Sequence, residues 1–371
     1  MQDSVSLAAR ALAHLQAGST DQAADVMRVP IEHYTDERRY AREVDAVFRG
    51  LPVSLALSLE LPKSGSYLAQ TLCGVPLLAV RGNDGVVRAF LNACRHRGTP
   101  VCADGHGQTL RFVCPYHSWA YDREGALATL TARETFGDVD TARLRLTALP
   151  CAERAGVIWV CLTPGLSFDI DAWLGEFRPL LDSLRLDQWH LYAQRTLDGA
   201  GWRVTMDGYL EVYHHDSVHG ATVGPQTIGN LLVHDTYGPH QRMVFGRRTL
   251  RDIDQVPEDP SAAEQCIRRI HAGFPNLSVS GILGGYCLVS HIFPGSHSGV
   301  TLTRQTVLTA TPPVSADQVA AAEAFSALAL KAHFETVSLT WRDKLALCRD
   351  ALMLRVSEQD GLKPVGGLAS R

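Results

Sequence analysis

The sequence predicts an α+β protein in which a small all-β unit precedes a larger unit of helices and strands. Three observations support this: a charged, periodic N-terminal segment, a middle segment of short apolar runs, and a last part that combines strand-like runs with long helical patterns. Apolar residues make up 46% and charged residues 20% of the 371 residues, which is ordinary globular usage at a length typical of two or three domains.

The elements are expected in the following order. Residues 1–50 should be mostly helical, with SLAARALAHL forming a short amphipathic helix. From about 51 to 165, runs such as GVPLLAV and GVIWVCL alternate with turns rich in Gly, Asn and Asp, the pattern of a small antiparallel β domain. An amphipathic helix is expected near 171–184.

The last part of the chain returns to strands and ends in a long helix. Strand-like segments begin at Trp189, Asn276, Gly285 and Gly299. Helical patterns appear around 205–218 and from 315 onward, where Ser315 or Asp317 could cap the first turn.

Charge and cysteine usage exclude several classes of protein. A net charge of −4 and a pI of about 6.4 give no electrostatic reason to expect nucleic acid or an anionic membrane as a partner. No apolar run approaches the roughly 18–20 residues of a spanning helix, and no secretory signal is visible at the start. Nine scattered cysteines do not form a disulfide framework, so we expect a cytoplasmic protein.

Two Cys-His pairs form the first candidate site. Cys94-x-His96 and Cys114-x-x-His117 are separated by 17 residues, and thiolate with imidazole suits Zn²⁺ or an iron–sulfur cluster. Zinc modules usually pair Cys with Cys and His with His, whereas here each half supplies one of each. That symmetry favours two tight turns converging on a two-iron cluster, in which one iron takes the two cysteines and the other the two histidines.

CRHRG followed by CPYHSWAYDREGAL resembles the C-x-H…C-x-x-H signature of Rieske [2Fe–2S] domains, over roughly residues 51–165. In the respiratory branch of that family a disulfide links the two cluster loops, and here those positions hold Thr99 and Tyr116. The chain is therefore more similar to the oxygenase and ferredoxin branch, whose potentials lie toward the low end of the Rieske range.

A second candidate site lies in GWRVTMDGYLEVYHHDSVHG, residues 201–220. If 205–216 is helical, Asp207, Glu211 and His214 share one face. His219 would then diverge from His214 by about 140°, so the helix must loosen or end between them for both to bind one metal. The alternative is an amphipathic helix with solvated polar side chains.

This segment resembles the mononuclear iron motif of Rieske non-haem iron ring-hydroxylating oxygenases, large (alpha) subunit family, in which a Trp-basic pair precedes acids and H-x4-H. The resemblance implies that His214 and His219 hold Fe(II) together with a distant carboxylate, as a 2-His-1-carboxylate triad. Asp360, after a lead-in similar to V-x-x-E-D, is the preferred third ligand, and Asp350 and Asp343 are its competitors.

The resemblance also assigns roles to two acids. Glu211 would bridge the two metal centres by connecting His214 to His117 of a neighbouring copy of the chain. Asp207, where many relatives carry Asn near the iron, would be a second catalytic residue. The family's catalytic domain is a helix-grip fold, an antiparallel sheet around a long C-terminal helix, so the domains implied are 1–50 (packing on the catalytic domain), 51–165 (Rieske) and 166–371 (catalytic).

The implied function is the terminal oxygenase component of a system with a separate reductase or ferredoxin, since no convincing nucleotide fingerprint is present. Electrons from NAD(P)H would pass through the Rieske cluster to the iron, and O₂ would hydroxylate or demethylate a small organic substrate, expected to be aromatic. A homotrimer is implied by resemblance alone. Leu283 and Phe293 are candidate pocket residues. The alternatives are a Rieske-type electron carrier without its own oxygenase chemistry and a zinc-stapled binding protein.

Overall fold

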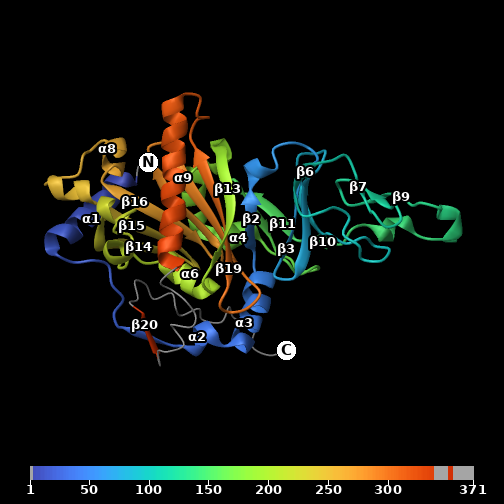
Figure 1. Ribbon diagram of the computed structural model, residues 1–371, viewed down its shortest axis with the longest axis horizontal. Helices are drawn as coiled ribbons and strands as arrows, with labels where there is room; N and C mark the ends of the chain where they lie inside the picture. The colour runs from blue at the N-terminus through green and yellow to red at the C-terminus, as the bar shows by residue number, and fades with distance from the viewer. Residues whose placement is uncertain (1–2, 338–349, 354–371) are drawn as a thin grey trace. The chain divides into compact units, whose positions relative to one another are not determined.

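The computed structural model describes residues 3–337 and 350–353, which form two units (Figure 1). The β unit comprises Arg42–Leu174 and Leu184–Gln188. The mixed unit comprises the residues up to Ala41, Gly175–Ser183, and the residues from Trp189 onward. None of the described helices is long and apolar enough to cross a bilayer.

The β unit contains three antiparallel sheets, with strand orders β10-β5-β4-β3-β6, β7-β8-β9 and β11-β12-β2. Its strands are β2 (Val53–Leu57), β3 (Ser66–Leu72), β4 (Val75–Arg81), β5 (Val87–Leu91), β6 (Gly105–Gln108), β7 (Phe112–Val113), β8 (Ala120–Tyr121), β9 (Leu127–Thr129), β10 (Ala148–Leu149), β11 (Cys151–Arg154) and β12 (Val157–Val160). Its helical segments are η1 (Val44–Arg49), η2 (Ser58–Glu60), η3 (Arg133–Thr135), η4 (Thr141–Leu144), α4 (Ile170–Leu174) and η6 (Leu186–Gln188). The antiparallel β domain predicted from the alternating apolar runs is confirmed.

The mixed unit is built on a seven-stranded antiparallel sheet with strand order β13-β19-β18-β17-β16-β15-β14. The strands of this unit are β1 (Met27–Pro30), β13 (His190–Gly199), β14 (Thr227–Tyr237), β15 (His240–Arg247), β16 (Ile267–Gly273), β17 (Leu277–Leu283), β18 (Tyr286–Pro294), β19 (Thr301–Thr309) and β20 (Asp350–Met353). Its helical segments are α1 (Ser4–Ala17), α2 (Glu32–Thr35), η5 (Gly175–Phe177), α5 (Arg178–Ser183), α6 (Trp202–Tyr209), α7 (His215–Val218), η7 (Gly224–Gln226), η8 (Arg248–Asp252), α8 (Pro260–Glu264) and α9 (Ala316–Val337), while α3 (Glu37–Glu43) spans the boundary between the units.

The long helix α9 lies across one face of this sheet and contacts β13 and β18 (Figure 1). It begins where the sequence predicts, because the Ser315 hydroxyl accepts a hydrogen bond from the Gln318 N–H at 3.2 Å. This antiparallel sheet with a long helix laid along it confirms the predicted helix-grip architecture.

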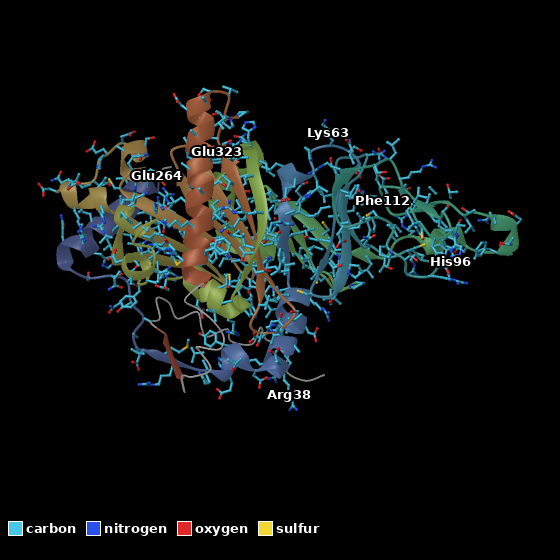
Figure 2. The ribbon with its side chains drawn as sticks, in the orientation of Figure 1. Arg38, Lys63, His96, Phe112, Glu264 and Glu323 are labelled. Atoms are coloured by element: carbon cyan, nitrogen blue, oxygen red, sulfur yellow. The ribbon has the colours of Figure 1, made fainter. Side chains whose placement is uncertain are left out.

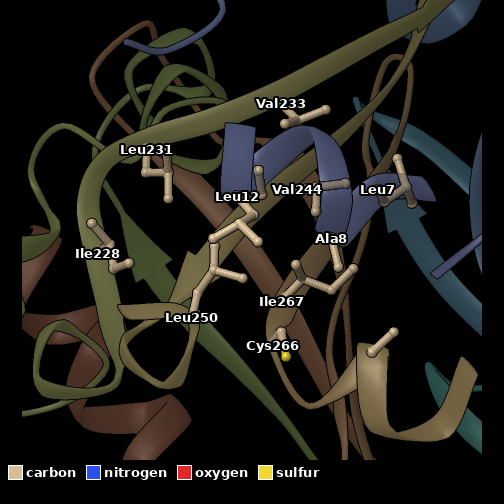
Figure 3. Close-up of a cluster of buried hydrophobic side chains, with 12 residues drawn as sticks. Leu7, Ala8, Leu12, Ile228, Leu231, Val233, Val244, Leu250, Cys266 and Ile267 are labelled. Atoms are coloured by element: carbon tan, nitrogen blue, oxygen red, sulfur yellow. The ribbon is translucent and has the colours of Figure 1, made fainter. Parts of the chain in front are cut away.

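The opposite face of the sheet is covered by α1 at the β14–β16 end. Leu7, Ala8, Ala11 and Leu12 of α1 are buried against apolar side chains of these strands (Figure 3). Side chains alternate between the two faces of a strand, so Ile267 joins this core and its neighbour Arg268 lies on the face toward α9. The cavity described below lies on that second face.

The expected helix over 205–218 is wrong, because α6 ends at Tyr209 and α7 begins only at His215. The Glu211 carboxylate accepts the His214 backbone N–H at 3.1 Å, a local side-chain bond that replaces a helical one. The buried side chain of Val212 packs with Leu210 in an apolar cluster of the sheet, which also favours the break. The two histidines therefore lie on a bent segment and not on one helix face.

Two other expectations need correction. The strand-like run from Trp189 ends at Gly199, and Trp202 already begins α6. The helix expected near 171–184 is interrupted at Gly175, whose φ of +47° is costly for any residue with a Cβ.

Candidate functional site

The two Cys-His loops are built alike in the β unit. In the first loop the Cys94 N–H donates to Thr99 O, and in the second the Cys114 N–H donates to Trp119 O, both at 2.8 Å. Each loop turns through a residue with positive φ: Gly98 at +74° and Ser118 at +59°. Both cysteines are buried in one apolar cluster that also contains Phe112. Phe112 and His96 are labelled in Figure 2.

The two loops bring the imidazole rings of the two predicted histidine ligands together. The imidazole rings of His96 and His117 lie with their centroids 4.6 Å apart. Trp119 stacks on His96 with centroids 4.9 Å apart, and Tyr116 stacks on His117 with centroids 3.9 Å apart. Burial and the neighbouring His117 lower the pKa of His96, which favours the neutral, ligating form.

The donor atoms of this pair of loops fit a two-iron cluster. The Nδ1 atoms of His96 and His117 are both enclosed and have no hydrogen-bond partner among the described residues, and Cys94 and Cys114 are free thiols. Two unpartnered imidazole nitrogens beside two thiols are the donor set of a Rieske centre.

Tyr121 also contacts the first loop. Its hydroxyl accepts the Arg95 N–H at 2.9 Å and lies 3.3 Å from Cys94 Sγ. Burial and this contact with Cys94 raise the pKa of Tyr121, so the phenol stays protonated and can donate toward the sulfur.

In the mixed unit, His214 and His219 face each other across the bend between α6 and α7. Their ring centroids are 4.9 Å apart. Glu211 contacts Nδ1 of His214, and Glu335 on α9 accepts a hydrogen bond from Nδ1 of His219 at 3.0 Å. Each imidazole therefore has its Nδ1 bound by a carboxylate, and its Nε2 is the nitrogen left to bind a metal.

Hydrogen bonds hold Glu335 in place and ionised. Its Oε2 also accepts the Thr222 hydroxyl at 2.7 Å. Burial alone would raise the pKa of Glu335, but the hydrogen bonds from His219 and Thr222 outweigh burial and lower it. Burial lowers the pKa of His219, and the hydrogen bond to Glu335 opposes this shift.

Glu335 was not predicted from the sequence, where HFETV reads only as part of a helix. The contact with His219 joins residues 116 positions apart, so only the packing of α9 reveals it. Thr336, the next residue, places its hydroxyl 3.3 Å from Nε2 of His219.

The predicted residue Asp207, and His215 beside the first histidine, have other partners. The carboxylate of Asp207 accepts the Tyr34 hydroxyl at 2.9 Å and is not part of the cavity wall. His215 is buried, its Nδ1 lies 3.3 Å from the Thr227 hydroxyl, and burial followed by the two neighbouring histidines lowers its pKa to about 3.

The three candidates for the third ligand cannot be placed. Asp343 and Asp360 lie outside the described residues. Asp350 is described only as backbone, where it pairs with Pro30 in the short β1–β20 ladder.

A cavity of about 170 Å³ opens beside the two histidines. Its walls come from the α6–α7 segment, from strands β15–β19, and from the α9 residues Phe325, Leu328, Ala329, Ala332, His333 and Thr336, which repeat at helical spacing. Leu288 and Gln305 line it as expected for the strands after 276, whereas the buried Phe293 does not. Phe293 is an odd-numbered residue on β18 and points to the face opposite Leu288, stacking on His291. The side chain of Leu283 lies outside the described residues.

Comparisons with known families match both sites. A profile described as the Rieske [2Fe-2S] domain matches residues 52–147. A profile described as the ring hydroxylating alpha subunit (catalytic domain) matches residues 186–339, which include His214, His219 and Glu335.

Two known proteins are similar to this chain in sequence over part of its length, and a solved structure is similar in fold. The glycine betaine monooxygenase oxygenase subunit of Chromohalobacter salexigens is 29% identical over 62% of this chain, and the chain spans 52% of that relative's length. The anthranilate 1,2-dioxygenase large subunit of Burkholderia cepacia is 25% identical over 67% of this chain and 61% of the relative. The solved structure of a quaternary ammonium Rieske monooxygenase in complex with L-carnitine has a TM-score of 0.75 at 20% identity, covering 88% of this chain and 89% of that one, a likeness of fold.

Proposed function

Since the chain belongs to the Rieske ring-hydroxylating oxygenase alpha-subunit family, we propose that it is a terminal oxygenase component that hydroxylates or demethylates a small organic substrate. The observation that carries the proposal is the pair His214 and His219, each held through Nδ1 by a carboxylate beside a cavity. A cluster-bearing electron carrier would need neither the histidine pair nor the cavity.

The cofactors of this family are a Rieske [2Fe–2S] cluster and a mononuclear Fe(II), which when bound supply one-electron transfer and O₂ activation. Cys94, Cys114, His96 and His117 would hold the cluster, and His214 and His219 would hold the iron. We propose Asp360 as the third iron ligand, with Asp350 and Asp343 as its competitors. The test is the iron content of three separate variants in which each of these residues is replaced by Ala. Only replacement of the true ligand should lower the iron content while the cluster spectrum stays unchanged.

The chain's own residues prepare the site for a substrate. Glu211 and Glu335 fix the proton of each imidazole on Nδ1, which orients both Nε2 atoms for a metal. Phe245, Leu288, Phe325 and Leu328 supply apolar cavity walls that exclude water from the reacting position. A volume of about 170 Å³ is close to the roughly 150 Å³ that holds one benzene, so the substrate should be small.

The substrate class is part of the proposal. Relatives include proteins named for glycine betaine, carnitine and anthranilate, so both quaternary ammonium compounds and aromatic compounds of this size are candidates. An aromatic substrate remains the prediction from the sequence. The test is turnover with a reductase, NADH and O₂, read by mass as incorporation of ¹⁸O or loss of a methyl group. No O₂-dependent product from any small aromatic or quaternary ammonium compound would contradict the proposal.

We also propose that electrons cross between copies of the chain in a homotrimer, with Glu211 as the connection. The support is the contact of Glu211 with His214 and the resemblance noted above. Mixing Cys114→Ser chains, which lack the cluster, with His219→Ala chains, which lack the iron, tests it: mixed oligomers should recover activity that neither variant has alone. Recovery would not occur if transfer took place within one chain.

The separate NAD(P)H-dependent reductase or ferredoxin and the cytoplasmic location also remain proposals. The described cysteines are all free thiols, which supports a reducing compartment. A pull-down with the reductase encoded nearest the gene, followed by cluster reduction in stopped flow, tests the partner.

A further inference from the structure

Arg268 reaches one end of the cavity from the middle of the sheet. It lies on β16 opposite Phe245 of β15, and both line the cavity together with Ile270, the next residue on that face. Its neighbour Ile267 belongs to the opposite face, which packs on α1. Arg269 also lines the cavity, but its guanidinium reaches Ser4 of α1. The guanidinium of Arg268 is therefore directed away from the α1 core.

The guanidinium has few partners. Its Nη2 donates to Gln226 Oε1 at 2.6 Å, and its Nε is enclosed with no hydrogen-bond partner among the described residues. No carboxylate in the described part of the chain forms an ion pair with it, and the charged side chain that acts on its pKa is another cation, Arg247. Burial, with the charge of Arg247 added, lowers the pKa of Arg268 to about 10, so it stays protonated at neutral pH.

Arg269 provides the contrast on the same strand. Its guanidinium pairs with Glu264 of α8 and donates to the Ser4 hydroxyl. A buried cation normally has such a partner, because an uncompensated buried charge is strongly unfavourable. Arg268 faces a cavity instead, and a planar guanidinium fork is the group that best binds a carboxylate.

We propose that Arg268 is the anchor for a carboxylate of the substrate, so that the enzyme acts on small organic anions or zwitterions. The apolar part of such a molecule would lie along Phe245 and Leu288, and its reacting carbon would lie toward His214 and His219. This inference rests on the proposed function, because it assigns the substrate class of that same cavity.

The test uses two pairs of probes that match in size and differ in the carboxylate: benzoate with benzamide, and glycine betaine with choline. Calorimetric titration of the holoenzyme should show that at least one of the two carboxylates binds about tenfold or more tightly than the matched compound that lacks the carboxylate. In Arg268→Gln that carboxylate should lose about ten- to a hundredfold in affinity, while its partner compound changes by less than about twofold. Arg268→Lys, which keeps the charge without the fork, should fall between the two.

Arg251→Gln is the matched control, because Arg251 is exposed in the same unit and its loss changes the net charge by the same amount. Equal affinity of wild type and Arg268→Gln for both carboxylates overturns the proposal. Lack of preference for either carboxylate in the wild type also overturns it, so the result does not depend on the variant folding. Failure of the proposed function would appear separately, as no O₂-dependent product although the Arg268-dependent preference persists.

Discussion

Glu335→Gln tests the structural basis of the iron site most sharply. The substitution removes the negative charge at the end of the 3.0 Å hydrogen bond from His219 Nδ1 and weakens the acceptor of the 2.7 Å bond from Thr222. Changes of this kind to a group behind a metal-binding histidine typically reduce metal affinity by about 10–100-fold, or about 1.4–2.8 kcal/mol. We expect iron affinity to fall by that factor while the cluster in the other unit is unaffected.

The assay is anaerobic titration of Fe(II) into protein whose mononuclear site has been cleared with a chelator, with the visible cluster absorbance monitored throughout. Glu323→Gln is the matched control, because Glu323 is exposed on the same helix (Figure 2). Wild-type iron affinity in Glu335→Gln would show that the carboxylate does not support His219 as a ligand.

Three further predictions address the bridge, the pH dependence and the packing. Glu211→Gln should keep the cluster spectrum and lower substrate-coupled turnover by about 10-fold or more, measured against Glu323→Gln, whose side chain is exposed on α9; unchanged turnover refutes the bridge. Burial, followed by nearby arginine charges, lowers the pKa of His271 to about 3. Between about pH 6.5 and pH 3 the unfolded chain therefore binds a proton that the folded chain does not, and the free energy of unfolding decreases as the pH falls through this range. His271→Leu should therefore reduce the loss of unfolding free energy between pH 7 and pH 5 by roughly 2 kcal/mol in urea titrations, and an identical pH profile would contradict this. Leu7→Ala, at a side chain 1% exposed in the α1 core, should cost about 2–5 kcal/mol in thermal unfolding, whereas the exposed Ser6→Ala should cost nearly nothing; equal effects would refute the assigned packing.

The first site could be predicted from sequence because its ligands lie on two short loops. The two turns that carry Cys94, His96, Cys114 and His117 are closed by hydrogen bonds between residues a few positions apart, such as Cys94 N–H to Thr99 O. Local spacing therefore carries most of the information about this site.

The second site depends on contacts that local spacing does not contain. Helical periodicity over 205–216 suggested a continuous helix, but the Glu211 carboxylate takes the His214 N–H and ends that pattern. Glu335 becomes part of the site only because α9 packs next to His219.

A related reason explains why strands β14 to β16 were not predicted from the sequence. β15 is buried on both faces, by the α1 core on the Val244 side and by the cavity on the Phe245 side, so the alternation that marks a half-exposed strand is missing. As a result three of the seven strands of the sheet, among them β16 with Arg268, were not visible in the pattern.

The most direct test of the central claim, that one chain carries both a cluster and a mononuclear iron, is the ratio of iron to acid-labile sulfide after anaerobic loading. The account predicts about three irons for about two sulfides per chain, and about two irons for about two sulfides once His214 and His219 are replaced by Ala. A wild-type ratio of about two irons to two sulfides would make the protein an electron carrier, and the absence of visible absorbance and sulfide would contradict both sites.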